Sequence, residues 1–223
     1  MKNNKKLLRI KKLYSRINIH LFGIKMSFLL PPKKENLNKY ISLGTSCFTR
    51  SKLSTYGIKP RKKQGELTFP FDLCVTPITS IEKILLNDFK DYFDDLHYNG
   101  EFWVNKKYNI EYLHDKDITT ADQLKSRYTQ RIDNFRHIMK TSTPVIITTL
   151  FNEKIQPQTL NNIHTALKSY GGRFKYVVIN LKYDDEIIYK EILYPASLAQ
   201  NWYTVKDSAE ADKKYIDAVL NPN

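Results

Sequence analysis

The sequence predicts an α/β fold in which helices flank a mostly parallel sheet. Residues 145–150 and 174–181 are continuous runs of apolar and β-branched residues, which is typical of strands buried on both faces. Other segments carry apolar residues at spacings of three and four, as amphipathic helices do, and they cover residues 77–87, 120–139 and 156–170. Because helices alternate with strands along the chain, we expect the strands to lie parallel.

We predict a basic amphipathic helix over residues 1–30. Seven Lys and Arg residues over positions 5–25 surround a stripe of apolar residues, and this stripe consists of Leu7, Ile10, Tyr14, Ile17, Leu21, Ile24 and Phe28. Pro31 and Pro32 end the helix, and residues 31–39 form a polar linker. Residues 40–223 then form one α/β domain, a size that suits a single core.

The domain begins with a short predicted strand at 40–43. Residues 44–46 form a turn, and a helix follows over 47–56 with Gly57 as its C-cap. Residues 67–71 are expected to be extended.

Later elements are less regular in pattern. Residues 89–103 are aromatic without a clear period, and residues 108–113 are predicted to form a strand. Pro144 stops the helix that precedes the first buried strand. Residues 207–220 are predicted to form a terminal helix.

Charge is distributed unevenly along the chain. Residues 1–63 hold 17 Lys and Arg and one acidic residue, Glu35, whereas the rest of the chain holds 19 basic and 22 acidic residues. A nucleic-acid-binding domain usually carries its basic charge on a folded face, so we expect no specific nucleic acid partner. We expect residues 1–30 to bind an anionic membrane surface instead.

Cysteine usage and hydropathy favour a cytoplasmic location. Cys47 and Cys74 cannot form a disulfide framework, and free thiols fit a reducing compartment. The sequence has no run of 18 apolar residues, and no signal-peptide cleavage site follows residues 17–30. We therefore predict a cytoplasmic protein that can lie peripherally on the inner membrane.

Gly44-Thr45-Ser46-Cys47 is the most specific local feature. A cysteine that follows a strand and starts a helix lies beside unpaired N–H groups, which can stabilise an oxyanion, and the helix dipole favours a thiolate. Gly44 permits close approach of the backbone to a ligand. The alternatives are that Cys47 is a small buried apolar residue, and that Ser46 is a helix N-cap or the nucleophile itself.

His114 is the best candidate for a general base. It follows a predicted strand, and Asp115 or Asp72 can orient its ring. The alternative is a loop histidine that caps the helix beginning at 119–120. Asp72 is expected to be partly buried and therefore paired, so it can equally hold Arg131 or cap the turn that follows.

Arg127 and Arg131 are four residues apart and share one face of the predicted helix. They can grip a phosphate or carboxylate of a substrate, or they can bridge to Asp122 and Asp133 as ordinary surface pairs.

The sequence gives no support for a cofactor. It has no Walker loop, no GxGxxG and no GxSxG motif. His97 follows Asp94 and Asp95, but this spacing matches no recognised set of metal ligands, so we expect no metal site.

Several motifs resemble, in their order along the chain, one bacterial family of unknown function that is described as papain-like cysteine peptidases. The motifs are Gly44–Cys47, Phe69–Asp72, His114–Asp115 and Arg127–Phe135, and a buried strand led by Pro144 follows them. The resemblance covers roughly residues 40–181. Members of that family are often encoded among genes for capsule or lipopolysaccharide synthesis.

The resemblance implies a cell-envelope precursor, or a protein of that pathway, as the substrate. The chain departs from the family pattern at Leu73, where Trp is usual, and at Gln130, where a second Arg is usual. Residues 148–150 also replace the Arg near which the buried strand commonly ends. An SGNH-type esterase with Ser46 as nucleophile is the weaker alternative, because no matching Asp-x-x-His occurs near the C-terminus.

We thus predict acyl transfer through a thioester, by hydrolysis or by transfer to an acceptor. Cys47 is the nucleophile, His114 the base, and Asp72 or Asp115 the orienting acid. Backbone around Thr45 to Cys47 forms the oxyanion hole. The rivals are a non-catalytic, membrane-associated accessory protein of polysaccharide assembly, and a sugar or phosphosugar transferase favoured by the basic helix and the arginine pair.

Overall fold

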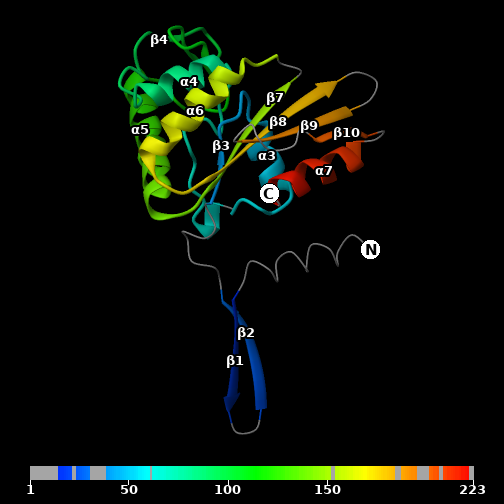
Figure 1. Ribbon diagram of the computed structural model, residues 1–223. Helices are drawn as coiled ribbons and strands as arrows, with labels where there is room; N and C mark the ends of the chain where they lie inside the picture. The colour runs from blue at the N-terminus through cyan, green and yellow to red at the C-terminus, as the bar shows by residue number, and fades with distance from the viewer. Residues whose placement is uncertain are drawn as a thin grey trace.

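A five-stranded sheet forms the centre of the computed structural model (Figure 1). Its order is β10-β9-β8-β7-β3, and the strands are β3 (Tyr40–Ser42), β7 (Val145–Phe151), β8 (Lys175–Tyr183), β9 (Ile187–Tyr194) and β10 (Asn201–Val205). The residues that the structure describes are 15–21, 24–30, 39–60, 62–151, 154–183, 187–194, 201–205 and 208–220.

The sheet is mixed, and the expectation of a mostly parallel sheet was wrong in part. β3, β7 and β8 are parallel, whereas β9 runs antiparallel to β8 and β10 antiparallel to β9. A parallel pair needs a crossover of about a dozen residues or more, but Tyr183 and Ile187, which end β8 and begin β9, are only four positions apart. The short connection therefore imposes a hairpin.

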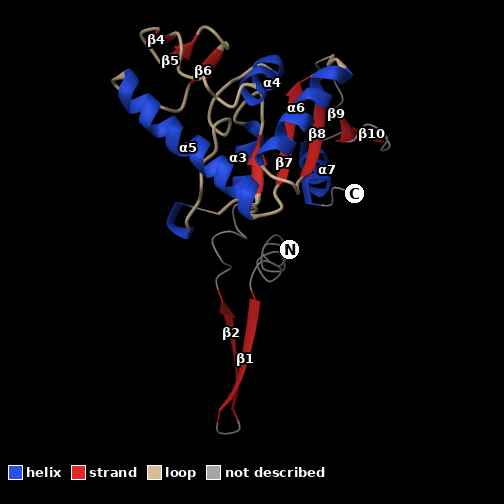
Figure 2. Ribbon diagram, turned by 60° about the vertical axis from the view of Figure 1, so that its left-hand side comes forward, coloured by secondary structure: helices blue, strands red, loops and turns tan. Residues whose placement is uncertain are grey.

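Helices cover both faces of the sheet (Figures 1 and 2). α3 (Phe48–Thr55) and α7 (Ser208–Leu220) share one apolar core, to which Leu53 and Ile216 belong. α4 (Ile78–Leu86), α5 (Ala121–Thr141) and α6 (Pro157–Tyr170) contribute to the other core. The predicted helices at 47–56, 77–87, 120–139, 156–170 and 207–220 are confirmed, with ends that differ by at most two residues.

Alternation along β7 explains the two cores. Ile146 and Leu150 belong to the core with α4, α5 and α6, whereas Ile147 belongs to the core with α3 and α7. Successive strand residues point to opposite faces, so a strand covered on both sides must be apolar throughout. This pattern is the reason that residues 145–150 could be recognised as a buried strand.

A second, smaller sheet connects α4 to α5. It consists of β4 (Leu96–Tyr98), β5 (Trp103–Asn105) and β6 (Ile110–Tyr112), paired antiparallel in that order. β6 lies inside the strand predicted at 108–113. The chain then enters α5 through Thr120, whose hydroxyl accepts from Gln123 N, and the Gln123 side chain accepts in return from the N–H of Thr120.

Two more strands occur near the N-terminus. β1 (Ser15–Leu21) and β2 (Ile24–Leu30) pair antiparallel, where we expected part of a helix. The reason is a second period in the sequence: Ile17, Ile19 and Leu21 alternate with polar residues, which also fits a strand. Residues 1–14 and 31–38 lie outside the described residues, so the predicted helix stays a prediction over residues 1–14.

None of the described helices is both long enough and apolar enough to cross a bilayer.

Candidate functional site

The loop between β3 and α3 is held by hydrogen bonds at every position before Cys47. Gly44 N donates to Ser42 Oγ at 3.0 Å, and Thr45 Oγ1 donates to the carbonyl of Thr149 at 3.0 Å. Ser46 Oγ accepts from Phe48 N at 3.3 Å. The N-cap position itself is occupied by Cys47, so Ser46 lies one residue before the position that one of our two alternatives gave it. A Cβ atom at Gly44 would lie 2.5 Å from the carbonyl oxygen of Ser46, so this position requires glycine.

Cys47 occupies the N-cap position of α3 and differs from the other cysteine in its surroundings. Cys47 is partly exposed as a residue, and its thiol makes no hydrogen bond with any residue that the structure describes. Cys74 is buried, donates to the carbonyl of Pro70 at 3.4 Å and lies 3.3 Å from Thr76 Oγ1. Burial raises the pKa of the Cys74 thiol to about 12, so Cys74 is inert and Cys47 is the thiol that a substrate can reach.

The N-terminus of α3 surrounds Cys47 with positive potential. The first helical hydrogen bond runs from Ser51 N to the Cys47 carbonyl, so the N–H groups before Ser51 have no acceptor within the helix. The first turn contains no acidic residue, and it contains Arg50. Both features favour a negative charge near Cys47.

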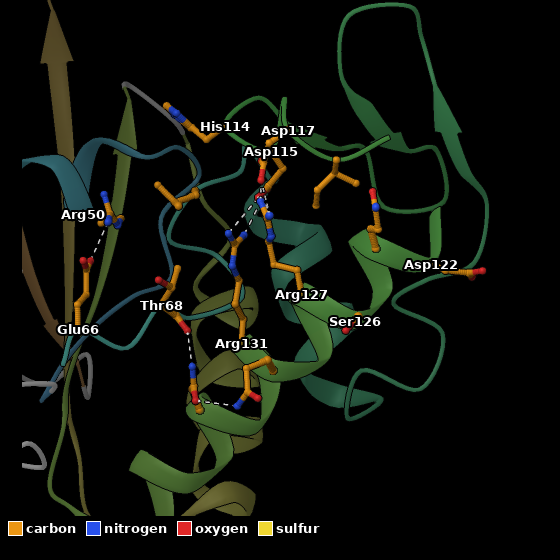
Figure 3. Close-up of a pocket in the computed structure, with 15 residues that line it drawn as sticks. Arg50, Glu66, Thr68, His114, Asp115, Asp117, Asp122, Ser126, Arg127 and Arg131 are labelled. Atoms are coloured by element: carbon orange, nitrogen blue, oxygen red, sulfur yellow. Dashed lines mark hydrogen bonds and ion pairs between the residues drawn. The ribbon is translucent and has the colours of Figure 1, made fainter. Parts of the chain in front are cut away.

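An open polar groove of about 1180 Å³ lies between α3 and α5 (Figure 3). Arg50 of α3 lines one side together with Glu66 and Thr68, and α5 lines the other side. The loop at 114–118 closes one end of the groove. Positive and negative charges along the groove nearly cancel, because three arginines and four carboxylates line it. These residues are Arg50, Arg127, Arg131, Glu66, Asp115, Asp117 and Asp122.

Asp115 is the electrostatic centre of the α5 side. Its buried carboxylate accepts from Arg127 at 2.9 Å, from two nitrogens of Arg131 at 3.0 and 3.3 Å, and from the Tyr128 hydroxyl at 2.8 Å. The Arg131 guanidinium also lies over the Tyr128 ring, 4.3 Å from its centroid. Both oxygens of Asp115 are therefore occupied, and neither is available to His114.

Arg127 is shared between two carboxylates. Besides its bond to Asp115, it makes a bidentate pair with the exposed Asp117 at 2.9 and 2.6 Å. Hydrogen bonds from Arg127 lower the pKa of the Asp117 carboxyl to about 2. The prediction that Arg127 and Arg131 share one helical face is confirmed, but their partners are Asp115 and Asp117 and not Asp122, and Arg131 makes no pair with Asp133.

His114 is exposed at the rim of the groove, and its ring points away from Asp115 (Figure 3). It makes no hydrogen bond or ion pair with another described residue. We expected Asp115 or Asp72 to orient this ring. Neither carboxylate contacts it, because each one binds other groups.

Asp72 is buried, and its partners differ from the ones we expected. Its Oδ2 lies 2.5 Å from the ammonium of Lys59 and accepts from Phe69 N at 2.9 Å. Lys59 is also buried, and its ammonium lies 4.8 Å from the centroid of the Phe69 ring. Asp72 thus joins the segment after α3 to the turn at 69–72. The expectation that it pairs with His114 or Arg131 was wrong, since its partners are Lys59 and Phe69 N.

The structure therefore gathers part of the predicted site. His114, Asp115, Arg127 and Arg131 line one groove, whereas Cys47 with Gly44, Thr45 and Ser46 belongs to the neighbouring loop and does not line it. Arg50 lies in both places, since it follows Cys47 by three residues and lines the groove. Sequence reasoning missed Arg50, although a position three residues after a helical nucleophile is a neighbour on the helix surface.

The part of the chain that the structure describes contains no cluster of three His, Cys, Asp or Glu side chains that could hold a metal ion. His97 lies 2.5 Å from Asp95 as an exposed pair.

Comparisons with models of protein families, with curated proteins and with solved structures found no match.

Proposed function

We propose that the protein is a cysteine-dependent hydrolase or acyltransferase with Cys47 as its nucleophile. The observation that carries this proposal is the position of Cys47: its thiol has no partner among the described residues, at the N-terminus of a helix, in a loop whose preceding residues are all held in place. A thiol that served only packing would be buried and hydrogen-bonded, as Cys74 is.

The chemistry that this position supports is acyl transfer. The Cys47 thiolate attacks the carbonyl carbon of the substrate, a C–S bond forms, and the carbonyl electron pair moves to oxygen. The N–H groups of Thr49 and Arg50, which have no acceptor within the helix, stabilise that oxyanion. Collapse of the intermediate expels the protonated leaving group, and water or an acceptor then attacks the thioester and returns the thiol.

His114 remains the candidate base in this proposal. It is exposed, makes no hydrogen bond or ion pair with a described residue, and lines the same groove as Arg50. A histidine without a carboxylate partner acts as a base less effectively than one that is oriented. The family resemblance supplies the proposed substrate, which is a cell-envelope precursor or a protein of that pathway.

Alkylation kinetics test the nucleophile. We expect iodoacetamide at pH 7 to label Cys47 about two- to fivefold faster than an ordinary exposed thiol, because a helix N-terminus stabilises a thiolate by about 0.3–1 kcal/mol. The matched control is Thr129→Cys in a Cys47→Ser background. Thr129 is exposed in the middle of α5, so the introduced thiol has no helix terminus beside it.

A second experiment tests whether Cys47 forms an acyl-enzyme. p-Nitrophenyl acetate should add one acetyl group to Cys47, detected by peptide mass spectrometry, and the control thiol should gain it more slowly. Equal rates at the two thiols with both reagents would remove the basis for a catalytic Cys47.

A non-catalytic accessory protein at the membrane is the second candidate. The observation that favours it is the absence of an oriented base among the described residues, since Asp72 and Asp115 are both committed elsewhere. Its basis in the sequence is the basic, apolar segment at 1–30.

Vesicle sedimentation tests the membrane part of this candidate. The full chain should pellet with anionic vesicles at low salt and be released by high salt, because each Lys or Arg contributes about 1 kcal/mol near an anionic surface. A chain that starts at Lys33 should stay in solution, and vesicles of neutral lipid should retain less protein. Equal sedimentation of the two chains would refute binding through residues 1–30.

A further inference from the structure

Arg50 differs from the other arginines of the groove in how few of its donors are used. A guanidinium carries five N–H donors. Arg131 and Arg127 each bind carboxylate oxygens through both terminal nitrogens. Arg50 makes one hydrogen bond to a described residue, from its Nη2 to Glu66 Oε1 at 2.7 Å, and its buried Nε has no acceptor there.

The place of Arg50 links the groove to the nucleophile. Residues three apart on a helix are neighbours, with Cβ atoms about 5–6 Å apart, and helical side chains lean toward the N-terminus of their helix. Arg50 is therefore about one helical turn from Cys47, and it also lines the groove. Its side chain is about a quarter exposed, at 23%, so a ligand in the groove can reach it.

An arginine in the first turn of a helix is electrostatically unfavourable, so the presence of Arg50 there suggests a role other than helix stability. The positive end of the α3 dipole makes the first turn unfavourable for arginine, and α3 has no acidic residue there to offset it. Glu66, which is 11% exposed, supplies a single bond from outside the helix. The positive end of the α3 dipole and the partly neutralised Arg50 guanidinium therefore lie within the same helical turn as Cys47.

We propose that Arg50 is the anion-binding residue of the substrate site, and that the substrate carries a carboxylate or phosphate close to the carbonyl carbon that Cys47 attacks. This inference rests on the proposed function, because it takes Cys47 as the nucleophile. It replaces the arginine pair of α5 as the substrate contact. Arg127 and Arg131 hold Asp115 in place, and both terminal nitrogens of each arginine already bind carboxylate oxygens.

Two alkylating reagents that differ by one negative charge test the proposal. Iodoacetate carries a carboxylate, whereas iodoacetamide is neutral and otherwise similar. We expect the ratio of the iodoacetate rate to the iodoacetamide rate to be at least about fivefold higher at Cys47 than at the thiol introduced by Thr129→Cys. The difference should shrink as salt is raised, since salt screens exposed charges.

Variants assign the preference to Arg50. Arg50→Gln should reduce the ratio at Cys47 to that of the control thiol, and Arg50→Lys should keep part of it. Glu66→Gln should increase the ratio, because it removes the competing carboxylate. Arg136→Gln, at an exposed pair with Asp88, should leave the ratio unchanged. Thermal melting confirms that each variant is folded.

The outcomes separate this inference from the proposed function. A raised ratio that survives in Arg50→Gln would overturn the role of Arg50 and leave the helix terminus as the cause. An ordinary ratio at a fast-reacting Cys47 would overturn the anion site alone, whereas a Cys47 that reacts no faster than the control with iodoacetamide would refute the nucleophile. Inorganic phosphate and acetate, at equal ionic strength, should slow the labelling of Cys47 by iodoacetate more than its labelling by iodoacetamide. The anion that inhibits more strongly identifies the oxyanion that the site prefers. If neither anion has an effect, the result counts against the proposal.

Discussion

Replacing Asp115 with asparagine is expected to lower the free energy of unfolding by about 3–5 kcal/mol, the usual cost of removing one partner from a buried ion pair. Each carboxylate oxygen accepts from a guanidinium nitrogen, since Oδ1 binds Arg127 and Arg131 and Oδ2 binds Arg131 and Tyr128. Either orientation of an asparagine amide would therefore place its NH₂ group against an N–H donor. Urea denaturation measures the loss.

Asp117→Asn is the matched control for this substitution. Asp117 binds the same Arg127 side chain, but it is 66% exposed, and an exposed pair contributes only about 0–1 kcal/mol. A similar loss for the two variants would contradict the central role of Asp115. If Asp115 instead oriented a catalytic histidine, Asp115→Asn would leave stability intact and slow the labelling of Cys47.

Local patterns were sufficient for most helices and for the buried strands. The spacing of Leu124, Tyr128 and Phe135 reflects one buried face of α5, which any single helix shows within its own residues. β4 and β5 were missed because strands of three residues leave little periodicity in the sequence. The longer β9 and β10 were missed as well. The direction of β9 follows from a connection length, which is visible only once both strands are known.

The site was harder to predict than the fold because its contacts join distant residues. His114, Asp115 and the α5 arginines were recognised as candidates, and the structure does place them in one groove. The partner of Asp72 was missed: Lys59 lies 13 residues away, in a stretch of basic residues that looks like a solvated loop. Charge type alone cannot tell which of several cations a buried carboxylate binds.

Lys59→Met is expected to lower the free energy of unfolding by about 3–5 kcal/mol, although methionine fills similar space. The loss arises from Asp72, which is fully buried and whose Oδ1 has no hydrogen-bond partner in the part of the chain that the structure describes. Without the ammonium, the carboxylate would keep only the N–H of Phe69 as a donor among the described residues. Methionine also gives up the contact of the cation with the Phe69 ring.

A double-mutant cycle with Asp72→Asn shows whether the two residues act as a pair. Asparagine can still accept from Phe69 N, and the variant that combines both substitutions contains neither buried charge. It should therefore be more stable than the sum of the single losses predicts, by up to about 3 kcal/mol. Labelling of Cys47 in folded Asp72→Asn should match that of the unsubstituted chain, because Asp72 binds Lys59 and not His114. Additive losses would show that the ion pair is not coupled, and slower labelling in the folded variant would return Asp72 to the catalytic site.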